Sequence, residues 1–150
     1  MNGPEEFKWN DGFKLGYGPM DQTHEEFVEI VGAMLVCPDE EILGHLEAFA
    51  AHAEAHFAQE LKWMTETDFP STGCHDDEHA AVMKSVNEVR ELLKSGGDPA
   101  VARNLAEALA DWFPGHADYL DSALAQWLVK RKMNGVPLVF RRKDSMGTGD

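Results

Sequence analysis

The sequence predicts an all-α protein, an up-down-up-down four-helix bundle with an irregular N-terminal arm. Three observations support this fold class. Four segments of about 15–35 residues carry apolar side chains at helical spacing, short turns separate them, and strand patterns are nearly absent. A length of 150 residues suits one domain with its own core. We expect the arm over residues 1–19, the bundle over 20–134 and a partly disordered tail over 135–150.

The first two helices are predicted on either side of a proline. Apolar residues recur at helical spacing from Asp21 to Val36. Cys37-Pro38-Asp39 ends this helix, and because proline is favoured at a helix start, the second helix begins here and continues to Thr67. The arm that precedes them is rich in aromatic residues, which we expect to pack on the bundle: Phe7, Trp9, Phe13 and Tyr17.

The last two helices are delimited by glycine and by a capping pair. The third runs from Cys74 to Lys94, and Gly96-Gly97 ends it. Asp98-Pro99 is typical of an N-cap followed by proline in the first turn, so the fourth helix begins here and continues to about Met133. Residues 136–140 are apolar but include a proline, which argues against a strand.

The composition of the chain argues against several classes of partner and location. Its net charge is −14, and such an acidic surface repels nucleic acid. The sequence contains no run of about 18 apolar residues, which is the length needed to span a membrane. The first residues lack the basic and apolar regions of a signal peptide. Two cysteines do not form a disulfide framework, so we expect a cytoplasmic protein.

The basic residues are concentrated at the C-terminal end. Residues 1–129 hold 7 basic and 25 acidic side chains, whereas residues 130–150 hold 6 basic and 2 acidic ones. The two basic clusters are Lys130-Arg131-Lys132 and Arg141-Arg142-Lys143. The first suits the negative end of a helix and the second a solvated arm. The alternative is a docking surface for an acidic protein partner or an anionic membrane.

The seven histidines are spread so that each predicted helix carries at least one. Residues four apart on a helix share a face, and this spacing joins His56 to Glu60 and His75 to His79. Metal sites in bundles are built from side chains that converge from facing helices. His116 and Asp121 are five apart and do not share a face of a regular α-helix. Pro114-Gly115 predicts a local distortion, or a plain turn, at this point.

Four motifs that contain histidines follow one another along the chain. They are Gly18-Pro19-Met20-Asp21-Gln22-Thr23-His24, His56-Phe57-Ala58-Gln59-Glu60, His75-Asp76-Asp77-Glu78-His79 and Trp112-Phe113-Pro114-Gly115-His116 through Asp121. In order, they resemble the lead-in to the first histidine, the H-x-x-x-E and H-x-x-x-H helices and the W-x-x-x-H-x-x-x-x-D helix of the hemerythrins, most closely the single-domain bacterial members. The resemblance covers residues 7–133.

The resemblance implies a non-haem centre of two iron ions, joined by an oxo or hydroxo bridge, that binds O2 reversibly as a hydroperoxide. Carried over, His75, His79 and His116 would bind one iron, and His24 and His56 the other. Glu60 and Asp121 would bridge them, and O2 would bind at the iron with fewer ligands. Candidate walls of the O2 pocket are Phe27, Phe57, Trp112 and Leu120.

Several alternatives stay open at this point. The same ligands would serve a di-iron peroxidase, a nitric oxide reductase or an iron-buffering protein. No glutamate precedes a histidine by three residues, which counts against a ferritin-like site. Richer histidine ligation favours O2 binding over O–O cleavage, so we expect a carrier, used for storage, delivery or sensing, rather than an enzyme. His52 and Cys74 are each predicted to be structural or, alternatively, to lie beside the metal, and His45 lies too far along its helix to be a ligand.

Overall fold

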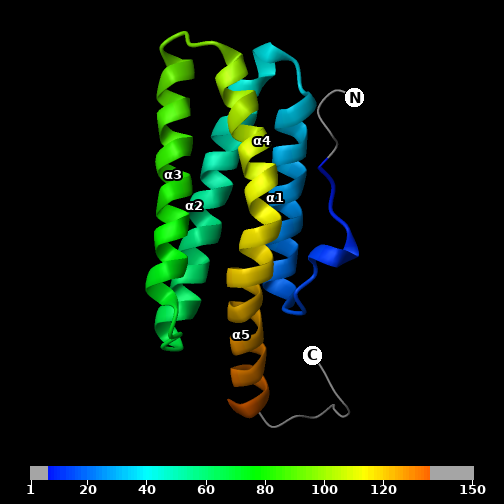
Figure 1. Ribbon diagram of the computed structural model, residues 1–150, viewed down its shortest axis with the longest axis vertical. Helices are drawn as coiled ribbons and strands as arrows, with labels where there is room; N and C mark the ends of the chain where they lie inside the picture. The colour runs from blue at the N-terminus through cyan, green and yellow to red at the C-terminus, as the bar shows by residue number, and fades with distance from the viewer. Residues whose placement is uncertain (1–6, 136–150) are drawn as a thin grey trace.

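The computed structural model describes residues 7–135, and these form an all-α four-helix bundle. Consecutive helices lie antiparallel, and the fourth returns against the first (Figure 1). The predicted fold class is therefore confirmed. The helices are α1 (Gly18–Val36), α2 (Ile42–Glu66), α3 (Thr72–Lys94), α4 (Pro99–His116) and α5 (Ser122–Gly135).

The helix boundaries differ from the predicted ones by a few residues, for local reasons. The first helix begins at Gly18 instead of Asp21, because Pro19 fits within its first turn. Pro38 does not start the second helix. A 3-10 turn, η2 (Asp39–Glu41), intervenes before Ile42. The third helix begins at Thr72, two residues before the predicted Cys74.

The fourth predicted helix consists of three consecutive helical pieces. A single π-helical turn, η3 (Ala117–Asp121), joins α4 to α5, which continues α4 beyond the end of the other helices (Figure 1). The chain stays helical through Pro114, so the plain turn considered from the sequence is not formed. Asp98 caps α4 as predicted, because its side chain accepts a hydrogen bond of 2.9 Å from the Ala100 N–H.

Two apolar clusters fill the bundle, one on each side of a polar level. The larger contains Phe27 and Phe57, and the smaller contains Met20 and Met64. On α1 and α2 the polar level lies between these pairs, at His24 and at Glu60. The polar side chains are therefore sealed along the bundle axis by apolar residues.

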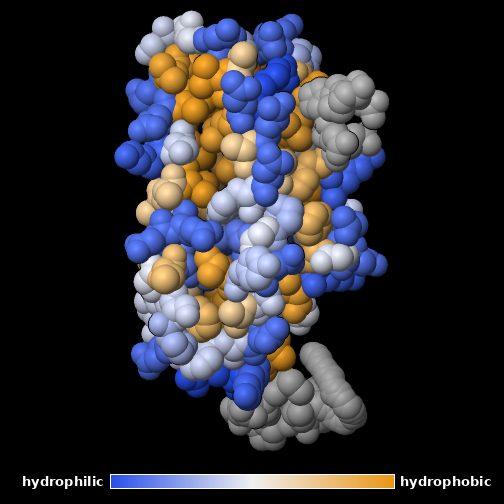
Figure 2. Space-filling view, viewed as in Figure 1, coloured by the Kyte–Doolittle hydropathy of each residue, from blue (hydrophilic) through white to orange (hydrophobic). Residues whose placement is uncertain are grey.

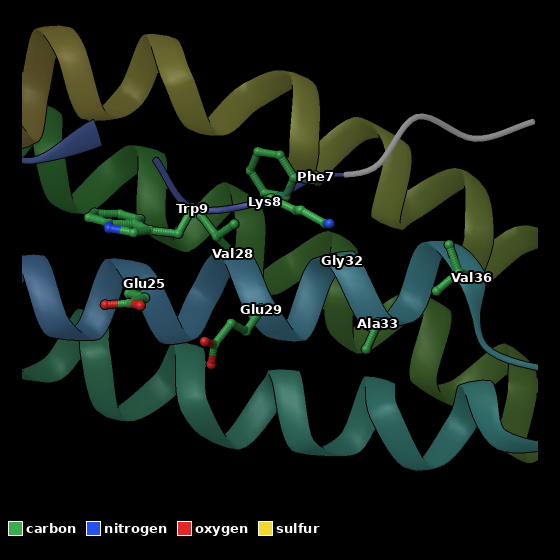
Figure 3. A pocket seen from close by; sticks show the side chains of 9 residues that line it. All are labelled: Phe7, Lys8, Trp9, Glu25, Val28, Glu29, Gly32, Ala33 and Val36. Atoms are coloured by element: carbon green, nitrogen blue, oxygen red, sulfur yellow. The ribbon is translucent and has the colours of Figure 1, made fainter. Parts of the chain in front are cut away.

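The N-terminal arm packs on the bundle, as the sequence predicted for its aromatic residues. Phe7 and Phe13 meet the ring of Phe113 edge-on, with centroids 6.1 and 5.4 Å apart. Gly32 permits this close approach, because a Cβ there would lie 2.7 Å from the Phe7 carbonyl oxygen. A groove remains between the arm and α1, beside Phe7 and Trp9 (Figure 3).

The surface is mixed in character and largely hydrophilic. Figure 2 shows hydrophilic side chains over much of one face, with hydrophobic ones between them towards one end of the bundle. Arg103 ties α4 to the end of α1, since its guanidinium donates to the carbonyl oxygens of Met34 and Cys37 and to Asp39. Among the described residues, no helix is long and apolar enough to cross a membrane.

Candidate metal centre

Seven polar side chains from all four helices of the bundle meet at one level of its core. Each is at most 6% exposed. Buried histidines and carboxylates are costly unless they are paired or bound to a metal. They are the seven residues predicted as ligands: His24, His56, Glu60, His75, His79, His116 and Asp121.

The cluster has two halves, and Glu60 lies between them. Its Oε1 atom is 3.1 Å from Nε2 of His75 and 3.5 Å from Nε2 of His79. Its Oε2 atom is 3.2 Å from Nε2 of His56 and 3.6 Å from Nε2 of His24. The two oxygens of one carboxylate therefore face different groups of histidines.

Asp121 repeats this division from the opposite side of the bundle. Its Oδ1 atom is 2.8 Å from Nε2 of His75 and 3.1 Å from Nε2 of His116. Its Oδ2 atom is 3.1 Å from Nε2 of His24. One half of the cluster thus offers three histidines and the other offers two, and both carboxylates contribute one oxygen to each half.

The π-helical turn explains how His116 and Asp121 reach the same place. A π turn has i to i+5 hydrogen bonds, so it brings residues five apart close to the same face. η3 begins directly after His116 and ends at Asp121. The distortion predicted from Pro114-Gly115 is therefore present, as a widened turn rather than a kink.

Many buried nitrogen and oxygen atoms of the cluster lack hydrogen-bond partners, and a bound metal would provide them with one. Both carboxylates, both ring nitrogens of His24 and of His75, and Nδ1 of His79 make no hydrogen bond among the described residues. Nitrogen and oxygen atoms of two overlapping groups lie within 4.8 Å of one another. Imidazole and carboxylate suit iron. The donor set therefore fits a metal such as iron.

The protonation of the cluster follows from its two carboxylates. Burial lowers the pKa of His24 and His75, but the nearby carboxylates of Asp121 and Glu60 outweigh it and raise each pKa to about 9. Burial prevails for His56 and His79, whose pKa values fall to about 4 and about 3. Burial opposes ionisation of the carboxylates, yet the histidines around them lower the pKa of both Glu60 and Asp121.

The four predicted pocket residues occupy different places around the cluster. Phe57 stacks on His79 with centroids 3.8 Å apart, and Trp112 stacks on His116 at 4.2 Å. Trp112 therefore covers the three-histidine half, whereas Phe57 borders both halves, because its ring also lies 5.4 Å from that of His56. Phe27 is fully buried, and Leu120 is half-buried.

Two residues that the sequence analysis did not single out contact the cluster. Phe113 is buried, stacks on Phe27 at 4.9 Å and meets the His24 ring edge-on at 5.2 Å. Glu78 accepts a hydrogen bond of 2.7 Å from Nδ1 of His116. Both residues lie within the quoted motifs. Glu78 could have been predicted as a partner of a histidine, because metal-bound histidines commonly donate a hydrogen bond to a carboxylate.

The remaining histidines and cysteines lie outside the cluster. His52 is 3.2 Å from Glu26, and its ring lies 6.1 Å from that of His56. His45 is half exposed and 3.9 Å from Glu41. Cys74 is free and exposed, although it precedes His75 in the sequence.

Comparison with known proteins gives the class to which this fold and cluster belong. The model of the hemerythrin HHE cation binding domain matches residues 15–128. A bacteriohemerythrin of Ralstonia nicotianae is 36% identical over 124 residues, which cover 83% of this chain and 90% of the relative. The chain therefore belongs to the hemerythrin family, and the resemblance seen in its motifs is confirmed.

Proposed function

We propose that the cluster binds two iron ions and that the protein binds O2 reversibly. His75, His79 and His116 hold one iron, His24 and His56 hold the other, and Glu60 and Asp121 bridge the pair. The observation that carries this proposal is the division of both carboxylates, each with one oxygen toward each group of histidines. The name of the Ralstonia relative supports the same function.

The two halves of the cluster take different roles in this proposal. The half with two histidines offers one protein ligand fewer, so His24 and His56 would leave room for O2 at an ion that they hold. When bound, the iron pair supplies electrons to O2 and recovers them on release. A carrier is favoured over an enzyme because Phe113 lies against the His24 ring and Phe27 stacks behind Phe113. These two apolar rings limit water on that side and offer no proton to a bound ligand.

The state of the two cysteines supports an intracellular location for the proposed carrier. Both cysteines are free, which suits the reducing cytoplasm that we expected.

The exposed Lys130 and Arg131 lie on α5, and the Arg131 guanidinium covers the Trp127 ring at 4.2 Å. The second basic cluster, 141–143, lies outside the described residues, and a protein partner for the tail stays a proposal.

An optical cycle tests this function. The reduced, iron-loaded protein is exposed to air and then to argon, and its ultraviolet-visible spectrum is followed. A carrier develops a coloured oxygenated form in air and returns to the colourless reduced form under argon. A peroxidase or nitric oxide reductase would pass directly to the oxidised form and stay there, and an iron buffer would form no reversible oxygenated species.

A further inference from the structure

Glu78 links the three-histidine half of the cluster to the protein surface. It lies on α3 beside His79, and its side chain is 46% exposed. Its Oε1 atom accepts two hydrogen bonds, one of 2.7 Å from Nδ1 of His116 and one of 3.2 Å from Nε1 of Trp112. We propose that Glu78 is a positioning residue, which holds the His116 ring with Nε2 toward the metal. This inference rests on the proposed metal centre.

The hydrogen bond selects the tautomer that a metal needs. When Nδ1 of His116 carries the proton and donates a hydrogen bond to Glu78, the lone pair of the neutral imidazole is on Nε2. That Nε2 atom faces the cluster, 3.0 Å from Nε2 of His79 and 3.1 Å from Oδ1 of Asp121. A carboxylate partner also makes the imidazole a stronger electron donor to a bound ion.

His116 lies at the junction of α4 and the π turn, where a hydrogen-bond partner fixes the direction of its ring. It is the last residue of α4, two positions after Pro114 and directly before the π turn. The Nδ1 atoms of His24, His75 and His79 are buried without a hydrogen-bond partner among the described residues. Those three rings are therefore held mainly by packing, whereas His116 is also held by Glu78.

Trp112 completes the arrangement by acting on both groups. Its ring stacks on His116, with an interplanar angle of 25°, and its N–H fixes the same Glu78 oxygen. The carboxylate is thus held in place although it is partly exposed. Stacking on Trp112 restrains the tilt of the His116 ring, and the hydrogen bond to Glu78 fixes the direction in which its Nδ1 atom points.

The test measures how fast metal leaves the protein, with Zn(II) as the probe. Wild type and variants are loaded with Zn(II), and its transfer to a coloured chelator is timed. Glu78→Ala should weaken retention by about 10–100-fold, the usual cost of losing such a partner. Glu78→Gln should stay close to wild type, because its amide oxygen can accept both hydrogen bonds. Asp77→Asn is the matched control, since it removes one charge from an exposed residue of the same turn.

A second readout separates positioning from a general loss of fold. The Zn(II)-loaded protein should show the His116 Nδ1 proton by NMR as a hydrogen-bonded signal, retained in Glu78→Gln and lost in Glu78→Ala. Equal retention of Zn(II) by Glu78→Ala and wild type would overturn the proposal. So would equal losses in Glu78→Ala, Glu78→Gln and Asp77→Asn, because only charge would then matter. Failure of the wild type to hold two metal ions would instead refute the proposed centre itself.

Discussion

The two halves of the cluster share both carboxylates and border on Phe57, but they differ in the number of histidines and in the other side chains around them. The half built from His75, His79 and His116 has three imidazoles, two stacked aromatic rings and a carboxylate behind one ring. The half built from His24 and His56 has two imidazoles, and Phe113 lies against His24. In the proposed function, the first half would hold its ion firmly and the second would leave a place for O2. The difference in histidine number would then let one type of donor serve both metal retention and O2 binding.

The largest effect is expected from removing a shared carboxylate. Glu60→Ala deletes one oxygen from each half, so iron content should fall from two ions per chain to nearly none. Glu54→Ala, an exposed position on the same helix, is the control and should keep both ions. Metal analysis of the purified proteins decides the matter. Retention of one full iron by Glu60→Ala would show that the halves are independent.

The next effect should be confined to the two-histidine half. His56→Ala removes one of its two imidazoles and should lower iron clearly, whereas His52→Ala should leave about two ions per chain. His52 lies one helical turn away, and its ring nitrogen faces Glu26. The same metal analysis compares the two variants. Equal iron loss in both would contradict the assignment of His56.

A smaller effect should separate the aromatic residues of the two halves. Phe113→Ser should admit water beside His24 and speed the decay of the oxygenated form several-fold. Trp112→Ser acts on the other half, so it should affect metal retention more than decay. Phe113→Leu is the control, because it keeps the site apolar. The decay rate is followed optically on protein shown to be folded by circular dichroism. Faster decay in Trp112→Ser than in Phe113→Ser would reverse the assignment of the O2 side.

The smallest effect concerns how the folding stability of the metal-free protein depends on pH. At every pH the metal-free protein should melt at a lower temperature than the iron-loaded form. The pKa values of His24 and His75 are raised to about 9, so their stabilisation is complete below the ordinary value of 6.5 and lost as pH rises toward 9. The pKa values of His56 and His79 are lowered, so their stabilisation is present above 6.5 and lost as pH falls through about 4 and about 3.

These opposite dependences place the stability maximum of the metal-free protein near pH 6.5. Thermal melts between pH 4 and 9 give the curve, and the iron-loaded protein serves as the comparison. A metal-free protein whose melting temperature equals that of the iron form, or rises steadily to pH 9, would contradict this account.

The sequence predicted the fold from helical spacing, and it predicted the cluster from two spaced pairs together with the resemblance to the hemerythrins. His56 with Glu60, and His75 with His79, share a face wherever an α-helix forms. The distortion after Pro114 was also predictable, but its form as a π turn was not. That form depends on how η3 packs among the other helices.

The contacts between helices could not be predicted from the sequence. Glu78 belongs to a run of three acidic residues, and only the rotation of α3 against α4 decides which one meets His116. Trp112 and Phe113 are adjacent, and the same rotation decides which half of the cluster each ring covers. Such choices depend on how each helix is rotated about its own axis when the bundle packs, and no local pattern encodes that rotation.

The ratio of released O2 to iron tests most directly whether the two halves are unequal. The reduced protein is saturated with O2, transferred to argon, and the released gas is counted against the iron in the same sample. One open position in a pair predicts two irons per chain and one O2 released per two irons. Release of one O2 per iron would mean that both halves are open, and no release would end the carrier proposal.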